Sequence, residues 1–494
     1  MNRFVNCSRF FPNIKFSIVK FAPKNDNFWQ DFGDTVEELT LNSCLINKSE
    51  FLHVIRLCPN LRMLSITRCD DLYRTWSVVK KLSQVKLKFN LMKTLAIYET
   101  SLMTKAIFDF MMISAPNLSS LTLQNCFGNM RPKDRTEVLD ALISYIGSRP
   151  EQIKKLNLAN THTDEPFLLK LADIEKLKLD ELRFTFNGVI ATLGRSGVLT
   201  LLRNQTELKT LDVTDSKGLS NFCLTEICKY MKKLRKLILN KCWLINDCGL
   251  KEVCRLENLQ ILDVSCCDRV TDLGLLEGLV PKGKNVVKLK ELYVGLLPYM
   301  SILAIYRLAQ QFDGLEVLDL SGSSNSITDE ALQMIFRYQT KLKYLNLDCC
   351  AKITDYGFTG LTEALHDERN YCCYNIDKLQ DLRFLNLGGC YQVTDLTFYN
   401  SFNLPELLEI NLSRCHNITE VGIKNMCKKC PNLESIDLSE CYNVLDSTVK
   451  MVTTDATRLI TLKLNGCTQI TDDCFELFKS CKYLKVVFNF IKKN

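Results

Sequence analysis

Three short stretches carry residue types that could bind a phosphate group or a metal ion. GLVPKGK, from Gly278 to Lys284, has the spacing of a phosphate-binding loop, in which backbone amides and a lysine hold the phosphates. The segment CKKC places Cys427 three residues before Cys430, and YCCY follows shortly after His366. Thiolate and imidazole groups are the usual protein ligands of zinc.

The surroundings of these stretches argue against both kinds of site. Asn285 stands where a phosphate-binding loop needs Ser or Thr for magnesium, and the stretch follows a predicted helix and precedes a predicted strand, the reverse of the required order. Neither cysteine group has a second CxxC at zinc-ribbon spacing. The chain has four histidines, far apart and without a nucleophile motif beside any of them. We therefore predict no enzyme activity, no cofactor and no metal site.

A longer pattern explains these residues better. The pattern L-x-x-L-x-L-x-x-C recurs along nearly the whole chain, mostly at intervals of 25 or 26 residues, as from Cys390 to Cys415 and from Cys415 to Cys441. A fixed period in the range of about 20–29 residues is the signature of leucine-rich repeats. A frayed further copy starts at Leu484. Sixteen copies start at Val36, Leu61, Met92, Leu118, Ile153, Leu179, Leu208, Leu234, Leu259, Leu289, Leu315, Leu342, Leu382, Leu407, Leu433 and Leu459.

Each part of the repeat predicts a structural element. The alternation L-x-L indicates a strand with one buried face, so Leu385 and Leu387 should point inward while Phe384, Asn386 and Gly388 point outward. A turn such as ITDYGF then begins a helix that Thr or Asp can cap. Because a single unit cannot bury its own apolar faces, neighbours must stack. The expected fold is α/β, a leucine-rich-repeat solenoid or horseshoe with parallel strands on the concave face and helices on the convex face.

Cysteine usage and charge indicate the compartment and the class of partner. Of 24 cysteines, ten occupy one slot of the repeat, and no apolar secretory segment opens the chain. We interpret the thiols as reduced, buried and close to the backbone of the neighbouring coil, in the cytoplasm, the nucleus or both. The net charge of +7 includes no long basic block, and no apolar run could span a membrane, so we predict neither a nucleic-acid nor a membrane partner.

Two intervals are longer than the period. The Cys slots at 350 and 390 are 40 residues apart, with the extra residues within 351–382, and 35 residues separate Cys126 from Thr161. We expect both insertions to protrude as loops, either merely tolerated or used for contact.

The outward strand residues are the candidate partner-binding surface. They form a stripe of acids and amides with a few aromatic side chains, which suits a specific protein partner. For the Asp and Asn residues the alternative is a structural role that is common in this repeat class. The candidate residues are Asp263, Tyr293, Asp319, Tyr344, Asn346, Phe384, Asn386, Asn411 and Asp437.

The Cys slot, the ITDxGL turn and the CPxL helix end together resemble the cysteine-containing leucine-rich repeats of F-box/leucine-rich-repeat proteins. That resemblance covers about residues 36–490 and implies a substrate receptor of an SCF-type ubiquitin ligase. It also implies a target protein on the concave face and, through an F-box, a Skp-type adaptor and a cullin.

The F-box itself is not recognisable in the sequence, because residues 1–35 hold no LPxE-like motif. VNCSRFFPNI followed by FWQDF is similar to the segment that leads from an F-box into the first repeat. We expect residues 1–35 to be either an N-terminal cap or such a remnant, with the F-box encoded upstream, and residues 36–494 to be the repeat domain. The alternative function is a free-standing scaffold or inhibitor, similar in architecture to ribonuclease-inhibitor proteins.

Overall fold

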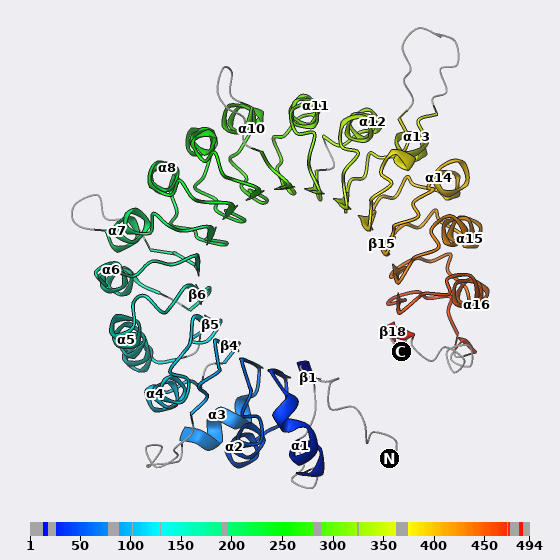
Figure 1. Cartoon of the computed structure of the whole chain (residues 1–494). Helices are drawn as coiled ribbons and strands as arrows, with labels where there is room; N and C mark the ends of the chain where they lie inside the picture. Colours follow the sequence, from blue (N-terminus) through cyan, green and yellow to red (C-terminus); the bar gives the residue numbers. More distant parts are fainter. Residues whose placement is uncertain are drawn as a thin grey trace. The chain divides into compact units, whose positions relative to one another are not determined.

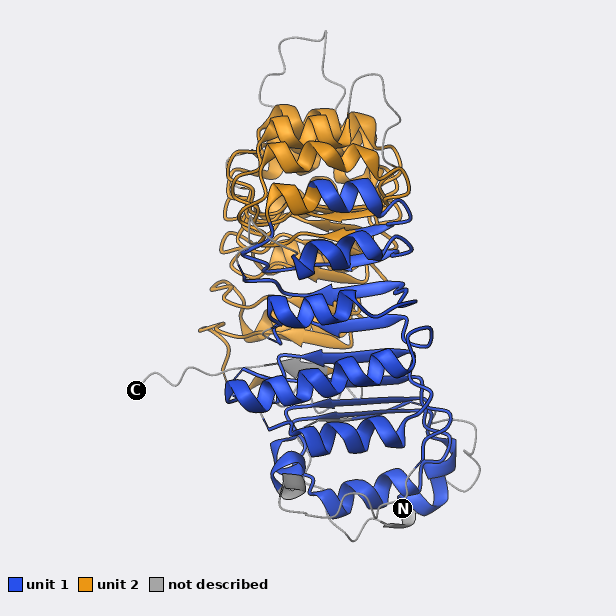
Figure 2. Cartoon of the chain, turned by 90° about the vertical axis from the view of Figure 1, so that its left-hand side faces the viewer, with its two compact units in different colours: residues 1–219, 225–236 blue, residues 220–224, 237–494 orange. Residues whose placement is uncertain are grey.

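The structure is a computed structural model of the whole chain. It describes residues 13–17, 26–77, 88–100, 102–128, 130–161, 163–188, 196–280, 288–323, 326–361, 374–471, 473–474 and 484–487. The chain divides into two compact units, residues 1–219 with 225–236, and residues 220–224 with 237–494 (Figure 2). The boundary crosses α8 (Asn221–Tyr230) and β9 (Lys236–Ile238).

Unit 1 is a stack of strand–helix coils. Its strands β1 to β8 pair in sequence order, and all of these pairings are parallel. The strands are β1 (Asn13–Ser17), β2 (Glu38–Asn42), β3 (Met63–Thr67), β4 (Thr94–Tyr98), β5 (Ser120–Gln124), β6 (Lys155–Leu158), β7 (Glu181–Phe184) and β8 (Thr210–Asp212). The helices are α1 (Asp26–Phe32), α2 (Lys48–Arg56), α3 (Asp70–Ser77), α4 (Lys105–Ser114), α5 (Pro132–Ser148), α6 (Glu165–Ala172) and α7 (Gly197–Asn204).

Unit 2 repeats the same plan with shorter strands. Strands β10 to β18 also pair in sequence order and in parallel. They are β10 (Ile261–Asp263), β11 (Glu291–Tyr293), β12 (Val317–Asp319), β13 (Tyr344–Asn346), β14 (Phe384–Asn386), β15 (Glu409–Asn411), β16 (Ser435–Asp437), β17 (Thr461–Lys463) and β18 (Lys485–Val487). The helices are α9 (Asp247–Leu250), α10 (Asp272–Leu279), α11 (Ile302–Gln311), α12 (Asp329–Tyr338), α13 (Asp355–Thr359), α14 (Asp395–Asn400), α15 (Glu420–Lys429) and α16 (Asp446–Asp455).

The repeat register predicts the strands. Each of the sixteen copies is followed, two residues after its first residue, by the start of one of the strands β2 to β17. Within each unit the strands line the inner side of a curved stack and the helices line the outer side (Figure 1). The predicted leucine-rich-repeat solenoid, with parallel strands on the concave side and helices on the convex side, is therefore confirmed within each unit.

The core lies between the two layers. Leu385 and Leu387 are fully buried, as the alternation predicts. All ten cysteines of the repeat slot are buried too. Eight of these thiols donate to a carbonyl oxygen of the preceding coil, as from Cys415 to Leu387 at 3.1 Å and from Cys441 to Leu412 at 3.1 Å. All cysteines in the described residues are free thiols.

Threonine caps several helices of the repeat turn, and Asp164 caps α6, so both predicted capping residues occur. The side chain of Thr354 accepts a hydrogen bond from the amide of Tyr356 at the start of α13, and Thr394 and Thr419 do the same for α14 and α15. The residue that follows, Asp355, Asp395 or Glu420, lies in the first helical turn, where a negative charge interacts favourably with the helix dipole.

One predicted loop is wrong, and one lies outside the described residues. The extra residues between Cys126 and Thr161 belong to α5, a helix of 17 residues with Pro132 in its first turn. Proline lacks an N–H group, but the N–H groups of the first helical turn have no partner within the helix, so Pro132 is compatible with a helix start. The insertion therefore lengthens the helix and does not form a loop. Residues 362–373 of the second insertion are not described.

The repeat pattern does not predict the first strand, β1. This strand pairs with β2, from Asn13 opposite Glu38 to Ser17 opposite Asn42.

Candidate protein-binding face

Five neighbouring strands of unit 2, β11 to β15, carry most of the candidate residues. Because they are parallel and in register, equivalent residues form rows across the sheet. One row consists of Glu291, Val317, Tyr344, Phe384 and Glu409, and the next of Tyr293, Asp319, Asn346, Asn386 and Asn411. We call the outward residues of β10 to β17, together with the residue two positions beyond each strand, the strand face of unit 2.

Tyr344 and Phe384 form a flat aromatic surface on this face. Their rings stack with centroids 4.2 Å apart and planes 3° apart. Both side chains are half-buried, although they lie on the side opposite the core. The next residue of the row beyond Phe384 is Glu409, which is exposed. The pair is therefore an apolar platform that is open to solvent and bordered by a carboxylate.

Tyr293 is not part of this stack. It lies one row further along, opposite Asp319, and its hydroxyl donates to Glu291 Oε2 at 3.0 Å. Burial, followed by the nearby charge of Glu291, raises the pKa of Tyr293. The structure thus brings two of the three candidate aromatic side chains together and holds the third beside an acid.

The Asp and Asn row has a clear structural role. Each side chain accepts a hydrogen bond from the backbone amide two residues later, which closes the turn that follows the strand. The distances are 2.9 Å from Ser265 to Asp263, 2.9 Å from Ser321 to Asp319, 3.1 Å from Asp348 to Asn346, 2.9 Å from Gly388 to Asn386, 2.8 Å from Ser413 to Asn411 and 3.0 Å from Ser439 to Asp437. Asp and Asn make this bond equally well, so it does not explain why some positions carry a charge.

The charged members of the row differ in their partners. Asp437 lies 3.3 Å from the ammonium of Lys463, whereas Asp319 accepts a hydrogen bond from the neutral amide of Asn346 at 2.8 Å. Burial raises the pKa of Asp263, and the negative charge of Asp319 adds to the effect. Tyr344 has its pKa raised to about 12 by burial and then by Asp319 and Glu409. Burial is the larger cause of both shifts, and the neighbouring carboxylates add to it with the same sign.

The acids that flank the candidate row were not predicted. Glu291, Glu409 and Asp348 occupy outward positions before or after it, and Asp348 is half-buried. The L-x-x-L-x-L register marks these positions as outward, so the sequence contains the signal. The strand face of unit 1 lacks this character over β3 to β5, where the middle residues Ser65, Ala96 and Thr122 are small, uncharged and buried.

The described residues give little support for a metal site or a phosphate-binding loop. Cys427 and Cys430 are buried, and burial raises the pKa of both thiols to about 12. Among the described residues no group of three or more His, Cys, Asp or Glu side chains could hold a metal ion. Gly278 belongs to α10, while 281–287, His366, Cys372 and Cys373 lie outside the described residues. No helix in the described part of the chain has the length and apolar character needed to cross a bilayer.

Comparison with known proteins agrees with the repeat architecture. A family described as "Leucine Rich repeat" matches residues 255–277, which include β10 and most of α10. The "Antagonist of mitotic exit network protein 1" of Candida glabrata is 30% identical over 193 residues, which are 34% of this chain and 35% of that protein. The matched region thus spans about a third of the length of this curated relative.

Two solved structures are similar at low sequence identity. The complex of Rad7 and Elc1 from yeast contains a chain that is 19% identical, with a TM-score of 0.45 and coverage of 72% of this chain and 88% of that one. An internalin (inlF) from Listeria monocytogenes is 13% identical, with a TM-score of 0.30 and coverage of 94% and 89%. The repeat match and the stacked strand–helix coils agree in showing a leucine-rich-repeat fold.

Proposed function

We propose that the chain binds a target protein on the strand face of unit 2 and acts as the substrate-recognition subunit of an SCF-type ubiquitin ligase. The observation that carries the binding part is the stacked, half-exposed pair of Tyr344 and Phe384. Rigid aromatic side chains bury a large area at a small entropic cost, and they are enriched among residues that dominate binding energy. The rows on either side supply the polar groups that surround such an anchor.

The ubiquitin-ligase part of the proposal rests on the resemblance of the repeats to those of F-box proteins. Under this proposal an F-box joined to residues 1–35 binds a Skp-type adaptor and a cullin, and the protein itself catalyses no reaction. The free, buried cysteines of the described residues favour a reducing compartment, which in a eukaryotic cell is the cytosol or the nucleus.

A second candidate function is inhibition by occupancy, without a ligase. The name of the Candida glabrata relative describes an antagonist, and an antagonist can act simply by covering its target. Both functions use the same strand face, and they differ in whether adaptor and cullin accompany the target.

Affinity purification of the tagged full chain tests the proposal. The test variant is Tyr344→Ala with Phe384→Ala, and the control is Tyr356→Ala with Tyr399→Ala, two exposed tyrosines on the helices of the same coils. We expect the test variant to lose the target about tenfold or more, which corresponds to about 1.4 kcal/mol, and the control to keep it. Equal target recovery with both variants would contradict binding at this face.

The same experiment separates the two functions. For this readout the chain is expressed with the F-box that the proposal joins to residues 1–35. A substrate receptor should then retain the adaptor and the cullin in the test variant, and the target should live longer in cells that carry this variant. An inhibitor should recover the target without either ligase subunit, and the target's lifetime should not depend on the chain.

A further inference from the structure

We propose that the strand face of unit 2 recognises a basic segment of its partner, with an arginine or lysine side chain placed against the Tyr344–Phe384 platform and beside Glu409 and Asp319. This inference rests on the proposed function and adds the chemical class of the partner.

The charges of the face are of one sign over six neighbouring strands. At the outward positions of β10 to β15 and two residues beyond each strand, there is no lysine, arginine or histidine. The same positions hold five acids: Asp263, Glu291, Asp319, Asp348 and Glu409. Within the described residues, none of the five forms an ion pair with a basic side chain.

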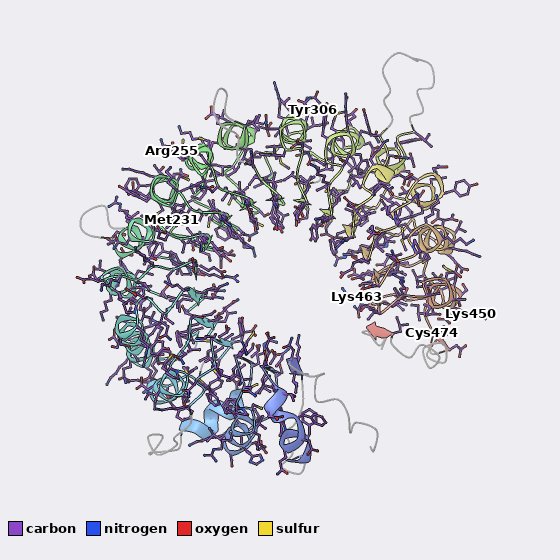
Figure 3. The ribbon with its side chains drawn as sticks, viewed as in Figure 1. Met231, Arg255, Tyr306, Lys450, Lys463 and Cys474 are labelled. Carbon is purple, nitrogen blue, oxygen red and sulfur yellow. The ribbon has the colours of Figure 1, made fainter. Side chains whose placement is uncertain are left out.

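The charge of the strand face changes at β16 and β17, where a lysine of the chain itself pairs with an acid. Asp437 on β16 is paired with Lys463 on β17, and Lys463 lies on the strand side of unit 2, opposite Lys450 on the helix side (Figure 3). Among the residues that the structure describes, Asp263 and Asp319 of the same row form no such ion pair. The acids without an ion pair in the described residues therefore lie on β10 to β15, which include the two strands of the aromatic platform, and the ion-paired acid lies on β16.

The turn-closing bond does not account for these charges. The turn-closing bond of the row is made by Asn at positions 346, 386 and 411 with the same geometry as by Asp at 263 and 319. An aspartate is costlier here, because like charges on neighbouring strands repel and partial burial disfavours the ionised form. A basic partner would remove this cost on binding, and so the charge complementarity points to a basic occupant.

The stacked rings of Tyr344 and Phe384 also offer a flat aromatic surface on which a cation can pack. A guanidinium or ammonium group is attracted to the face of an aromatic ring, and the attraction grows when a carboxylate lies beside it. Asp319 and Glu409 both act electrostatically on the hydroxyl of Tyr344, so their charges reach the platform from its two sides.

The basic residues of the same coils lie at the edge of the face. Lys290 and Lys343 immediately precede β11 and β13, and both pair with Glu316, at 3.8 and 2.6 Å. Arg383 is exposed at the equivalent position before β14. We therefore place the partner's cation over the rows that contain Tyr344 and Asp319, away from this edge.

Selection from a random peptide library on the immobilised full chain tests the inference. The test variant is Asp263→Asn, Asp319→Asn and Glu409→Gln, which keeps the turn-closing bonds, because Asn makes them elsewhere in the row. The control is Glu277→Gln with Glu330→Gln, which removes two exposed acids from helices α10 and α12. One recovered peptide is then made with citrulline, a neutral isostere, in place of each arginine.

We expect the recovered peptides to be enriched in arginine and lysine and to need Tyr344 and Phe384. Citrulline and the test variant should each weaken binding about tenfold, the control should not, and added salt should weaken binding further. Basic peptides that bind the test variant as tightly as the wild type would overturn the inference, since the attraction would then not come from these three acids.

The remaining outcomes also decide the question. Acidic or uncharged peptides that depend on Tyr344 and Phe384 would overturn the basic partner and leave the proposed function standing. Recovery of no peptide that depends on the strand face would overturn the inference too, as would self-association of the chain through this face in light scattering. The proposed function would then be judged by the purification with the aromatic variants, which does not depend on peptide charge.

Discussion

Asp355 and Thr394, 39 residues apart in the sequence, are joined by two hydrogen bonds. The amide of Thr394 donates to Asp355 Oδ1 at 2.8 Å, and its hydroxyl donates to Oδ2 at 2.7 Å. The same hydroxyl accepts a hydrogen bond from the amide of Leu396 at 3.2 Å, so Thr394 caps its own helix while it binds the preceding coil. Equivalent pairs in unit 2 are Asp247–Thr271, Asp272–Ser301, Asp329–Thr354, Asp395–Thr419 and Asp446–Thr471.

Asp355→Ala should loosen helix α14. The substitution removes a carboxylate that also accepts from the hydroxyl of buried Thr397 at 2.6 Å, and it leaves these donors without a charged acceptor. We expect a loss of about 2–4 kcal/mol in the local free energy of opening, measured by hydrogen exchange of the α14 amides. Asp313→Ala, at an exposed position outside the helices, is the control. Unchanged protection of α14 would show that the pairs do not hold neighbouring coils together.

Two glycines of unit 1 should respond to alanine with opposite signs. A Cβ atom at Gly197 would lie 2.4 Å from the backbone nitrogen of Leu169, because α6 and α7 approach closely there. Gly197→Ala should therefore destabilise unit 1 by about 1–3 kcal/mol. Gly147 lies in α5 with open space around it, so Gly147→Ala should stabilise by about 0.5–1 kcal/mol through helix propensity. Urea denaturation checks both, and a neutral result at Gly197 would contradict the close approach.

The buried thiols predict a loss of stability at alkaline pH. Burial raises the pKa of the Cys390 thiol to about 12, whereas a thiol in an unfolded chain has a pKa of about 8.5. Between these values the folded protein keeps a proton that the unfolded chain has lost, so stability falls as pH rises through the window and is unaffected below it. Each such thiol should contribute up to about 1.4 kcal/mol per pH unit.

Urea midpoints measured between neutral and alkaline pH test this slope. Cys390→Ala should reduce the slope by about one proton, and Cys248→Ala, at an exposed position, should leave it unchanged. A stability that stays constant across this range would mean that the slot thiols are not protected by the fold.

The fold was predictable because its signals are local and repeated. The alternation around Leu385 and the capping threonine at Thr394 are visible within a few residues, and each copy confirms the others. The strand β1 was not predicted, since Asn13–Ser17 lacks the leucine pattern. The length of α5 was also missed, because Pro132 suits a first helical turn as well as a loop.

The candidate binding face was only partly predictable. The outward residues could be named, but the stacking of Tyr344 on Phe384 requires β13 and β14 to pair in register across the forty-residue interval. The role of the Asp and Asn row depends on a bond to the following turn, which periodicity does not reveal. The absence of basic side chains over β10 to β15 emerges only when all three outward rows are read together.

Site-specific photo-crosslinking is the most direct test of a binding face on the strands. A photoreactive amino acid is placed at Asn386, on β14, and in a second sample at Tyr399, on the helix of the same coil. We expect a partner to crosslink at Asn386 and not at Tyr399, and the crosslink to disappear with Tyr344→Ala and Phe384→Ala. A partner captured at Tyr399 and absent at Asn386 would show that this protein binds through its helices.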